Sequence, residues 1–287
     1  MCIVERPTAV APLRAGPVEY RLDRRGDDTV LVFHGGHMRA SLPLGETIFE
    51  ELGYSVLAPS RPGYGKTPLH PDSSPEGFAM ATAELCAQLG VQRLAAVLAM
   101  SAGGRTGLAM AANYPDLVPR LILEGAVGFE PWPASGRYIG AKVLFNPVWE
   151  RVVWALVHSL MRWAPSAGLR VMMRSLSTEP AAQAVDGLSE HERATLAGLF
   201  ARMRSGCGFV TDLDFARRPM AVTIAQPVLV IASRGDKAVP LTQAESLKER
   251  LDRATLMLAD TSSHFLWFGP GSGEVADQIR MFLRDGG

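Results

Sequence analysis

Residues 94–105 read Leu-Ala-Ala-Val-Leu-Ala-Met-Ser-Ala-Gly-Gly-Arg, an apolar run that passes through a sharp turn into a helix-like segment. Small residues, Ala99 and Gly103, stand two positions before and two positions after Ser101. A serine held in a strained turn at a strand end requires small neighbours there, because the strand and the following helix approach closely. Ala99 replaces the more usual glycine but adds only one methyl group. The segment therefore predicts a nucleophile elbow with Ser101 at its tip.

Short apolar runs alternate with amphipathic patterns outward from this segment in both directions. We expect strands at residues 29–33, 55–58, 94–98, 121–123, 228–232 and 254–258. We expect helices at residues 77–89, 104–113, 241–251 and 274–283. Continuous apolar strands of this length are typical of a parallel sheet that is buried on both faces. The pattern predicts an α/β fold with a doubly wound, mostly parallel sheet, whose ligands gather at the carboxyl ends of the strands.

The alternation stops after Gly125 and resumes at Pro227. Between them we expect only helices, at residues 147–163, 167–176 and 189–203, separated by prolines. We therefore predict an α/β core of residues 1–129 and 220–287, interrupted by a helical cap insertion at 130–219. Four of the five tryptophans fall in the insertion. Packing of the insertion onto the sheet is the favoured role of these rings, and a wall of an apolar pocket is the alternative.

Composition narrows the function further. The 287 residues include 29 Lys or Arg and 29 Asp or Glu, so the net charge is zero. Proteins that bind nucleic acids or membrane surfaces usually carry a basic excess, so we expect neither partner. Three scattered cysteines indicate a reducing compartment, and no apolar stretch reaches the length of a membrane span. We expect a cytoplasmic protein, for which a homo-oligomer is possible.

A serine needs a base to become a nucleophile, and the base needs an acid to orient it. His264 follows the last expected strand, and Asp236 follows the strand at 228–232. Both residues are therefore expected at the same edge of the sheet as Ser101. The chain order Ser, Asp, His at three strand ends is far more specific than any one of these residues. This arrangement predicts a catalytic triad of Ser101, Asp236 and His264.

Each assignment has a structural alternative. The turn at Ser101 and the loop at His264 could be purely structural. Asp236 could cap the following helix, in which case Asp260 or Glu124 would be the acid. His34 is expected to form structural hydrogen bonds, and His37 could line the entrance or lie in solvent. His34 and His37 form an isolated His-x-x-His that lacks a third ligand, so we expect no metal.

Residues 60–67, Ser-Arg-Pro-Gly-Tyr-Gly-Lys-Thr, resemble a phosphate-binding P-loop. A P-loop must lead directly into a helix, whereas Pro68 and Pro71 follow at once. The stretch also lacks the Gly-x-Gly-x-x-Gly pattern of dinucleotide sites. We expect no nucleotide and no other cofactor.

With these motifs the chain resembles the α/β-hydrolase superfamily over nearly its whole length, most loosely in the insertion and at the N-terminus. The resemblance rests on residues 33–36 (Phe-His-Gly-Gly), residues 61–65 (Arg-Pro-Gly-Tyr-Gly), the Ser101 elbow, and the Asp236 and His264 loops. It implies that the backbone N–H groups of Gly36 and Ala102 form an oxyanion hole. A serine at the elbow is unlike the epoxide-hydrolase and haloalkane-dehalogenase branches, which are expected to carry an aspartate there.

We therefore expect a serine hydrolase that cleaves an ester, thioester or lactone of a small to medium apolar substrate through an acyl-enzyme. The expected pocket wall consists of His37, Met100, Trp154 and Phe265. One alternative is a carbon–carbon bond hydrolase acting on a diketone, because residues 101–104 resemble the elbow of such enzymes. Another is a member of the fold that binds a ligand without hydrolysing it.

Overall fold

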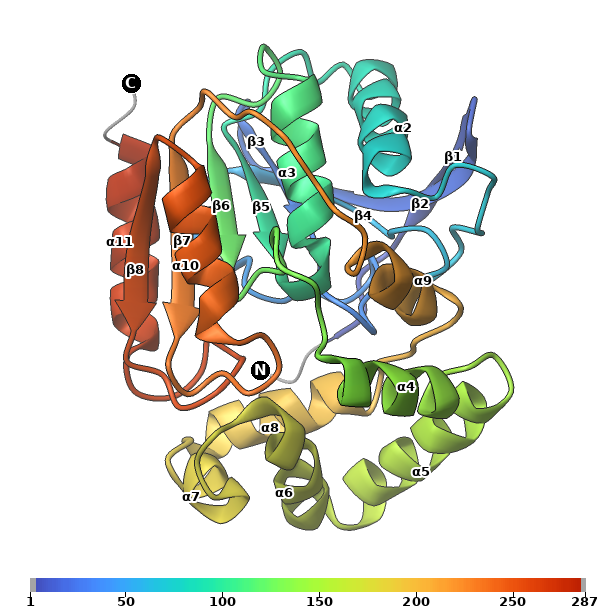
Figure 1. The fold of residues 1–287 in the computed structure, drawn as a ribbon, viewed down its shortest axis with the longest axis vertical. Coiled ribbons are helices and arrows are strands. Elements are labelled where there is room, and N and C mark those ends of the chain that lie inside the picture. The colour runs from blue at the N-terminus through green and yellow to red at the C-terminus, as the bar shows by residue number, and fades with distance from the viewer. Residues whose placement is uncertain (1–3, 285–287) are drawn as a thin grey trace.

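A computed structural model describes residues 4–284 of the chain. Its centre is an eight-stranded sheet with the strand order β1-β2-β4-β3-β5-β6-β7-β8 (Figure 1). The strands are β1 (Ala9–Leu13), β2 (Gly16–Asp23), β3 (Thr29–Phe33), β4 (Ser55–Pro59), β5 (Ala96–Met100), β6 (Leu121–Glu124), β7 (Val228–Ser233) and β8 (Ala254–Ala259). β1 and β2 pair antiparallel, and the remaining six strands run parallel. The predicted doubly wound, mostly parallel sheet is confirmed.

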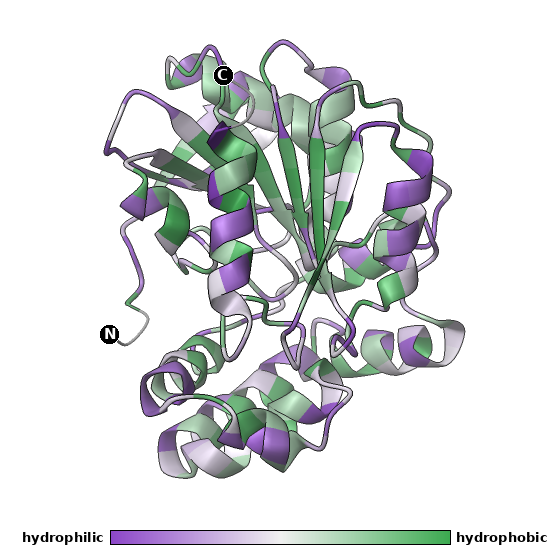
Figure 2. Cartoon of the chain, turned by 90° about the vertical axis from the view of Figure 1, so that its left-hand side faces the viewer, coloured by the Kyte–Doolittle hydropathy of each residue, from purple (hydrophilic) through white to green (hydrophobic). Residues whose placement is uncertain are grey.

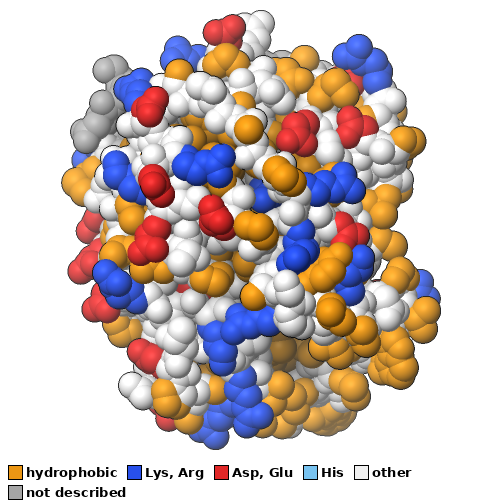
Figure 3. All heavy atoms as spheres, viewed as in Figure 1, with side chains coloured by type: hydrophobic (Ala, Val, Ile, Leu, Met, Phe, Trp, Pro, Cys, Tyr) orange, Lys and Arg blue, Asp and Glu red, His pale blue; other side chains and the backbone are white. Residues whose placement is uncertain are grey.

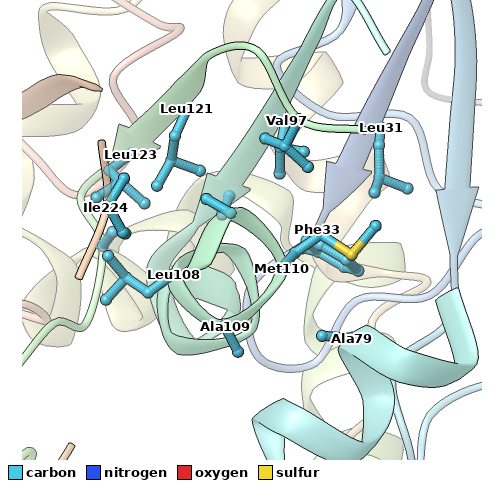
Figure 4. Close-up of a cluster of buried hydrophobic side chains, with 14 of the residues drawn as sticks. Leu31, Phe33, Ala79, Val97, Leu108, Ala109, Met110, Leu121, Leu123 and Ile224 are labelled. Carbon is cyan, nitrogen blue, oxygen red and sulfur yellow. The ribbon is translucent and has the colours of Figure 1, made fainter. Parts of the chain in front are cut away.

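Helices cover both faces of the sheet, which explains the continuous apolar strands. One face is covered by α2 (Pro75–Gln88), α3 (Gly104–Asn113) and α10 (Leu241–Arg250), and the other by α1 (Thr47–Glu51) and α11 (Ser272–Arg284). Figure 4 shows Leu108 and Met110 of α3 beside the strand residues Leu121 and Phe33. Because β3, β4, β5 and β6 are buried at every position, apolar residues are favoured on both of their faces. Figure 2 shows these strands coloured as hydrophobic along their length.

The segment between β6 and β7 forms helices that lie beyond the carboxyl ends of the parallel strands (Figures 1 and 2). These inserted helices are α4 (Ser135–Leu144), α5 (Trp149–Trp163), α6 (Pro165–Leu176), α7 (Ala181–Asp186), α8 (Glu190–Phe200) and α9 (Gly208–Phe215). They have a hydrophobic core of their own, which includes Trp154, Leu169 and Phe200. Within residues 4–284, no helix has the length and apolar character needed to cross a bilayer.

The antiparallel strands β1 and β2 were missed by the sequence prediction. In β2 the apolar residues Val18, Tyr20 and Leu22 alternate with Glu19 and Arg21, so the strand lacks the continuous apolar run that marks the parallel strands. Arg21 is satisfied inside the protein by Glu46, whose two carboxylate oxygens each lie 2.7 Å from its guanidinium nitrogen Nη2. The start of β5 was also placed two residues too early, because the apolar run begins at Leu94 in the preceding loop.

Candidate active site

Ser101 lies at a sharp turn between β5 and α3. Its φ angle is +48°, and His37 is the other non-glycine residue with positive φ in the part of the chain that the structure describes. A Cβ atom on Gly103 would come within 2.5 Å of the carbonyl oxygen of Phe33. On the next turn of the helix, Gly107 faces the methyl group of Ala99 too closely to accept a side chain. These contacts explain why small residues flank the serine, and they hold Ser101 partly exposed at the strand end.

The structure brings Asp236 and His264 together. Oδ2 of Asp236 lies 2.6 Å from Nδ1 of His264, while Oδ1 accepts the backbone N–H groups of Ala238 (2.8 Å) and Val239 (2.9 Å). Asp236 is nearly inaccessible to solvent. It does not cap the following helix, α10, whose N-cap residue is Pro240. The carboxylate is thus fixed by two N–H donors and directed at the imidazole.

The pKa of His264 follows from this contact. Burial alone would lower the pKa of the imidazole, because it disfavours the charged form. The negative charge of Asp236 and its hydrogen bond to the ring outweigh burial, so the pKa of His264 is raised above its ordinary value of 6.5. Asp236 therefore stabilises a protonated His264, which is the state that a general base reaches after accepting a proton.

Gly125 connects the serine turn with the Asp–His pair. β5 and β6 are paired with Met100 opposite Glu124, so Ser101 and Gly125 follow at neighbouring strand ends. Gly125 has a φ of +49°, and a Cβ atom there would lie 3.2 Å from Cε1 of His264 and 3.3 Å from Oδ2 of Asp236. The pair therefore lies against the strand end next to Ser101. A glycine directly after a buried strand, as at Gly125, is a sequence signal for such a close approach.

The end of α6 holds the acid and base loops together. The carbonyl oxygen of Leu176 accepts the N–H of His264 at 2.9 Å and that of Lys237 at 3.3 Å. Ser177 forms a β-bridge with Asp236 and donates its hydroxyl to the carbonyl of Ser262 at 2.5 Å. Neither Leu176 nor Ser177 was singled out from the sequence. Their role depends on chain segments that are far apart in sequence and meet only in the fold.

The residues predicted to form the oxyanion hole lie beside the serine. A Cβ atom on Gly35 would approach Cβ of Ser101 to 2.9 Å, and one on Gly36 would approach the Phe209 ring to 2.8 Å. Gly35 therefore passes close to Ser101 and Gly36 passes close to Phe209, so a side chain would fit at neither position. Ala102 is the residue after the serine. Backbone N–H groups at these two places are suited to bind a negative oxygen that develops at a carbonyl attacked by Ser101.

His34 has a structural environment. Its Nε2 atom lies 2.8 Å from Oε1 of Glu46, and both residues are buried. Its carbonyl oxygen accepts a hydrogen bond from Nε of Arg61 at 2.9 Å. These contacts fix the loop that carries Gly35 and Gly36, in agreement with the structural role expected for His34.

His37 contacts the inserted helices. Its Nδ1 atom lies 2.8 Å from Oγ of Ser205. The same Oγ accepts a hydrogen bond from the indole N–H of Trp154 at 2.7 Å. Ser205 is fully buried, and among residues 4–284 the one acceptor within reach of its hydroxyl hydrogen is Nδ1 of His37. Burial, together with the positive charge of Arg61, lowers the pKa of His37 to about 3. His37 is therefore neutral, and its proton is carried on Nε2.

The other three residues predicted for the pocket wall are buried in hydrophobic clusters. Met100 belongs to the cluster that includes residues of α1 and α11. Trp154 and Phe265 lie in the cluster of the inserted helices. His37 alone of the four is partly exposed, and its ring centroid lies 4.0 Å from that of Phe209. Phe209 was not identified from the sequence, since its place beside Gly36 arises from the packing of α9.

Residues 61–64 form a buried clamp with α9. The guanidinium of Arg61 binds both carboxylate oxygens of Asp212, one of them at 2.8 Å, and the hydroxyl of Tyr64 donates to Oδ2 at 2.5 Å. Burial and the adjacent carboxylate raise the pKa of Tyr64, so it stays protonated. No helix follows this turn before α2 begins at Pro75, which excludes the P-loop alternative. The motif instead fastens the core to the inserted helices.

Asp23, Glu46 and Glu50 form the one cluster within residues 4–284 with ligand atoms close enough for a metal ion. Arg21 pairs with both Asp23 and Glu46. Arg6 lies 2.5 Å from Glu50 and also contacts Asp23. These guanidinium groups neutralise the carboxylates, so the cluster is explained as an ion-pair network.

Comparison with known proteins shows the family to which this chain belongs. Residues 28–269 match the sequence model of the alpha/beta hydrolase fold. The chain is 33% identical to the uncharacterized hydrolase YcgS of Bacillus subtilis over 276 residues, which is 93% of this chain and 95% of the relative. It is 28% identical to a 2-hydroxy-6-oxononadienedioate/2-hydroxy-6-oxononatrienedioate hydrolase of Pseudomonas sp., over 75% of this chain and 74% of that one.

Solved structures show the same fold. An alpha/beta hydrolase fold protein from Nakamurella multipartita superposes with a TM-score of 0.78 at 22% identity, covering 98% of this chain and all (100%) of that one. A thermophilic esterase from Thermogutta terrifontis superposes with a TM-score of 0.66 at 20% identity, covering 98% and 99%. The chain is a hydrolase that belongs to the alpha/beta hydrolase fold family.

Proposed function

We propose that the protein is a cofactor-independent serine hydrolase that cleaves esters, thioesters or lactones of small to medium apolar substrates. One observation carries the proposal. The hydrogen-bonded pair of Asp236 and His264 lies against Gly125, at the strand end next to the strained Ser101 turn. A nucleophile, a base and an acid that orients the base are the groups that acyl transfer requires.

The reaction begins when Oγ of Ser101 attacks the substrate carbonyl. His264 accepts the hydroxyl proton through Nε2, and Asp236 stabilises the resulting imidazolium. The carbon–oxygen or carbon–sulfur bond to the leaving group then breaks, and His264 returns the proton to that group. A water molecule, deprotonated by His264, attacks the acyl-enzyme and releases the acid. Ser101 recovers its proton from His264, so the enzyme ends the cycle unchanged.

The developing oxyanion is bound by the N–H groups of Gly36 and Ala102. Such preorganised donors each lower the barrier by about 3 kcal/mol, because they strengthen as negative charge moves onto the carbonyl oxygen. The backbone at Gly36 is held between Phe209 and the fixed loop of His34. The donors therefore do not have to reorganise during the reaction.

A second candidate is a carbon–carbon bond hydrolase, which is favoured by the Pseudomonas relative and by the Ser-Ala-Gly-Gly elbow. The name of that relative specifies a dioate, which has two carboxylates. Arg61 and Arg105 line the cavity beside Ala102. Arg61 is paired with Asp212, and Arg105 donates to backbone carbonyls, including that of Arg218 at 2.6 Å. This small cavity is lined by neither Ser101 nor His264, and because both guanidinium groups are engaged, neither arginine is available to bind a second carboxylate.

The test is covalent labelling with a fluorophosphonate, located by mass spectrometry, together with turnover of aryl esters of increasing acyl length and of a vinylogous diketone. We expect the label on Ser101 and faster turnover of the esters. Ser101→Ala should abolish both signals, whereas Ser159→Ala, at an exposed serine of α5, should change neither. Faster turnover of the diketone would favour the second candidate. A folded protein that shows neither labelling nor turnover would contradict hydrolysis and favour a ligand-binding member of the fold.

A further inference from the structure

The surface of α4, α5 and α6 carries an unusual concentration of exposed apolar side chains. Of the fifteen large hydrophobic residues that are exposed in the described chain, nine fall between residues 139 and 171. We call these nine residues the apolar face: Ile139, Val143, Leu144, Val148, Trp149, Val152, Leu156, Trp163 and Val171. Trp163 is 76% exposed and Trp149 is 56% exposed. Figure 3 shows hydrophobic side chains crowded at the lower right, where Figure 1 places α4 and α5.

The apolar face is not a by-product of packing. On α5, Trp149, Val152, Leu156 and Trp163 follow at spacings of three, four and seven residues, which places them on one side of the helix. The opposite side buries Trp154 and Met161 in the core of the inserted helices. α5 is therefore apolar on two sides, although packing explains only one of them. Large apolar side chains gathered on the exposed side of a helix indicate an interaction site.

The charged residues of α4, α5 and α6 themselves are mostly basic. Residues 135–176 contain six Lys or Arg and a single acidic residue, Glu150. Glu150 is buried, and its Oε1 atom lies 3.3 Å from Arg204. The zero net charge of the whole chain therefore conceals an excess of five positive charges on this segment. Arg151 and Arg162 are exposed on α5 itself, and the guanidinium of Arg162 lies over the ring of Trp163.

We propose that the apolar face docks on an anionic lipid surface. Apolar side chains and tryptophans enter the boundary between headgroups and acyl chains, while Lys and Arg bind the phosphate groups. The overall charge balance led us to expect no membrane partner, but interfacial binding depends on the local charge. Because these helices lie beyond the strand ends that carry Ser101, docking brings the site close to the bilayer (Figure 1). The proposal does not depend on the reaction that the site performs.

A second copy of the chain is the rival occupant of the apolar face. In a two-fold symmetric contact the same surface is used by both copies. Lys142 and Arg170 are paired with Asp214 and Asp186 of neighbouring helices, but Arg137, Arg151, Arg162 and Arg174 of one copy would then meet the same four residues of the other. An anionic surface neutralises these charges, whereas a second copy adds to their repulsion. Charge complementarity therefore favours lipid.

The test is cosedimentation of the full chain with vesicles of phosphatidylcholine alone or mixed with phosphatidylglycerol. We expect binding to the mixed vesicles only, weakened by salt. Trp149→Ser with Trp163→Ser should weaken binding by roughly tenfold or more. Arg151→Gln with Arg162→Gln should weaken it by about thirtyfold, because each cation near an anionic surface contributes about a factor of five. Met281→Ser, at a half-exposed apolar residue of α11, is the matched control and should bind as the wild type does.

Three results would overturn the proposal. Equal binding to neutral and mixed vesicles, or binding that the arginine variants do not change, would show that charge is not the determinant. If the wild type binds neither vesicle type and sediments as a dimer, and Leu156→Ser restores the monomer, the apolar face is instead the contact between two copies of the chain. Circular dichroism verifies that each variant is folded. Esterase turnover is measured separately, so that a failure of the proposed hydrolase activity can be distinguished from a failure to bind lipid.

Discussion

Oδ2 of Asp236 and Nδ1 of His264 are 2.6 Å apart, although 28 residues separate the two in sequence. Both residues also contact the end of α6, through the Leu176 carbonyl and the Ser177 bridge. The position of the proposed base therefore depends on two strand ends and on one inserted helix.

The first prediction concerns pH. His264 must be neutral to accept a proton from Ser101, and Asp236 raises its pKa above 6.5. Activity should therefore fall as pH decreases through this raised pKa, giving an acid limb in kcat/KM above pH 6.5. Asp236→Asn should move the limb to lower pH, because burial then dominates, and should reduce kcat by about 10⁴-fold. Asp260→Asn, at the exposed alternative acid, should leave the profile unchanged.

The second prediction tests the close approach at Gly125. Gly125→Ala should reduce kcat by about 100-fold, because the new methyl group displaces His264 and Asp236. Gly90→Ala is the matched control, since Gly90 also has positive φ, at +75°, but has open space around it. Both variants should lose about 1 kcal/mol of stability through backbone strain, measured by thermal unfolding. Equal kcat values in the two variants would contradict the assigned role of Gly125.

The third prediction concerns the clamp between the core and α9. Asp212→Ala leaves the buried guanidinium of Arg61 without its carboxylate, and we expect a loss of about 3–5 kcal/mol in the free energy of unfolding. Asp214→Ala removes a neighbouring carboxylate whose partner, Lys142, is partly exposed, and should cost about 1 kcal/mol or less. Urea denaturation of both variants measures the difference. Similar losses would show that the clamp is no stronger than a surface ion pair.

The fourth prediction concerns Glu124, which burial keeps protonated at neutral pH. Burial raises the pKa of Glu124 to about 8, although the hydrogen bond from the N–H of Trp267 to Oε2 opposes this rise. The other oxygen, Oε1, has no hydrogen-bond partner among the described residues. The folded state thus binds more protons than the unfolded state between about pH 4.5 and 8, so stability should fall as pH rises through this range.

Glu124→Gln keeps an oxygen for Trp267 and removes the titration. At pH 9 this variant should exceed the wild type in unfolding free energy by a few kcal/mol, and the difference should shrink towards pH 5. Glu130→Gln, at an exposed carboxylate, provides the control. A pH-independent difference would mean that Glu124 does not titrate on unfolding.

The fifth prediction concerns the link between His37 and Ser205. Ser205→Ala removes the hydroxyl donor to Nδ1 and leaves the Trp154 N–H without its acceptor, which should cost about 1–3 kcal/mol. Two-dimensional ¹H–¹⁵N spectra of the imidazole should show a proton on Nε2 of His37 in the wild type and a mixture of tautomers in the variant. A wild-type proton on Nδ1 would contradict the hydrogen-bond assignment.

Much of the fold could be predicted because its signals are local. The parallel strands are buried on both faces and therefore appear as apolar runs, as at β3 and β7. The Ser101 turn was detectable because Ala99 and Gly103 are close to it in sequence. β2 lacks such a run, because its apolar residues alternate with Glu19 and Arg21, whose side chains are buried against Ser60 and Glu46.

Near neighbours in the sequence encode the six parallel strands and the chemical groups at their ends, because the burial of apolar residues and the turn at Ser101 leave local patterns. Which of these groups meet depends on contacts that form between distant parts of the chain. Asp212 reaches Arg61 across 151 residues, and Leu176 reaches the loops of Asp236 and His264 from the inserted helices. Such contacts leave no local pattern, since a polar group becomes suited to burial only when folding supplies its partner.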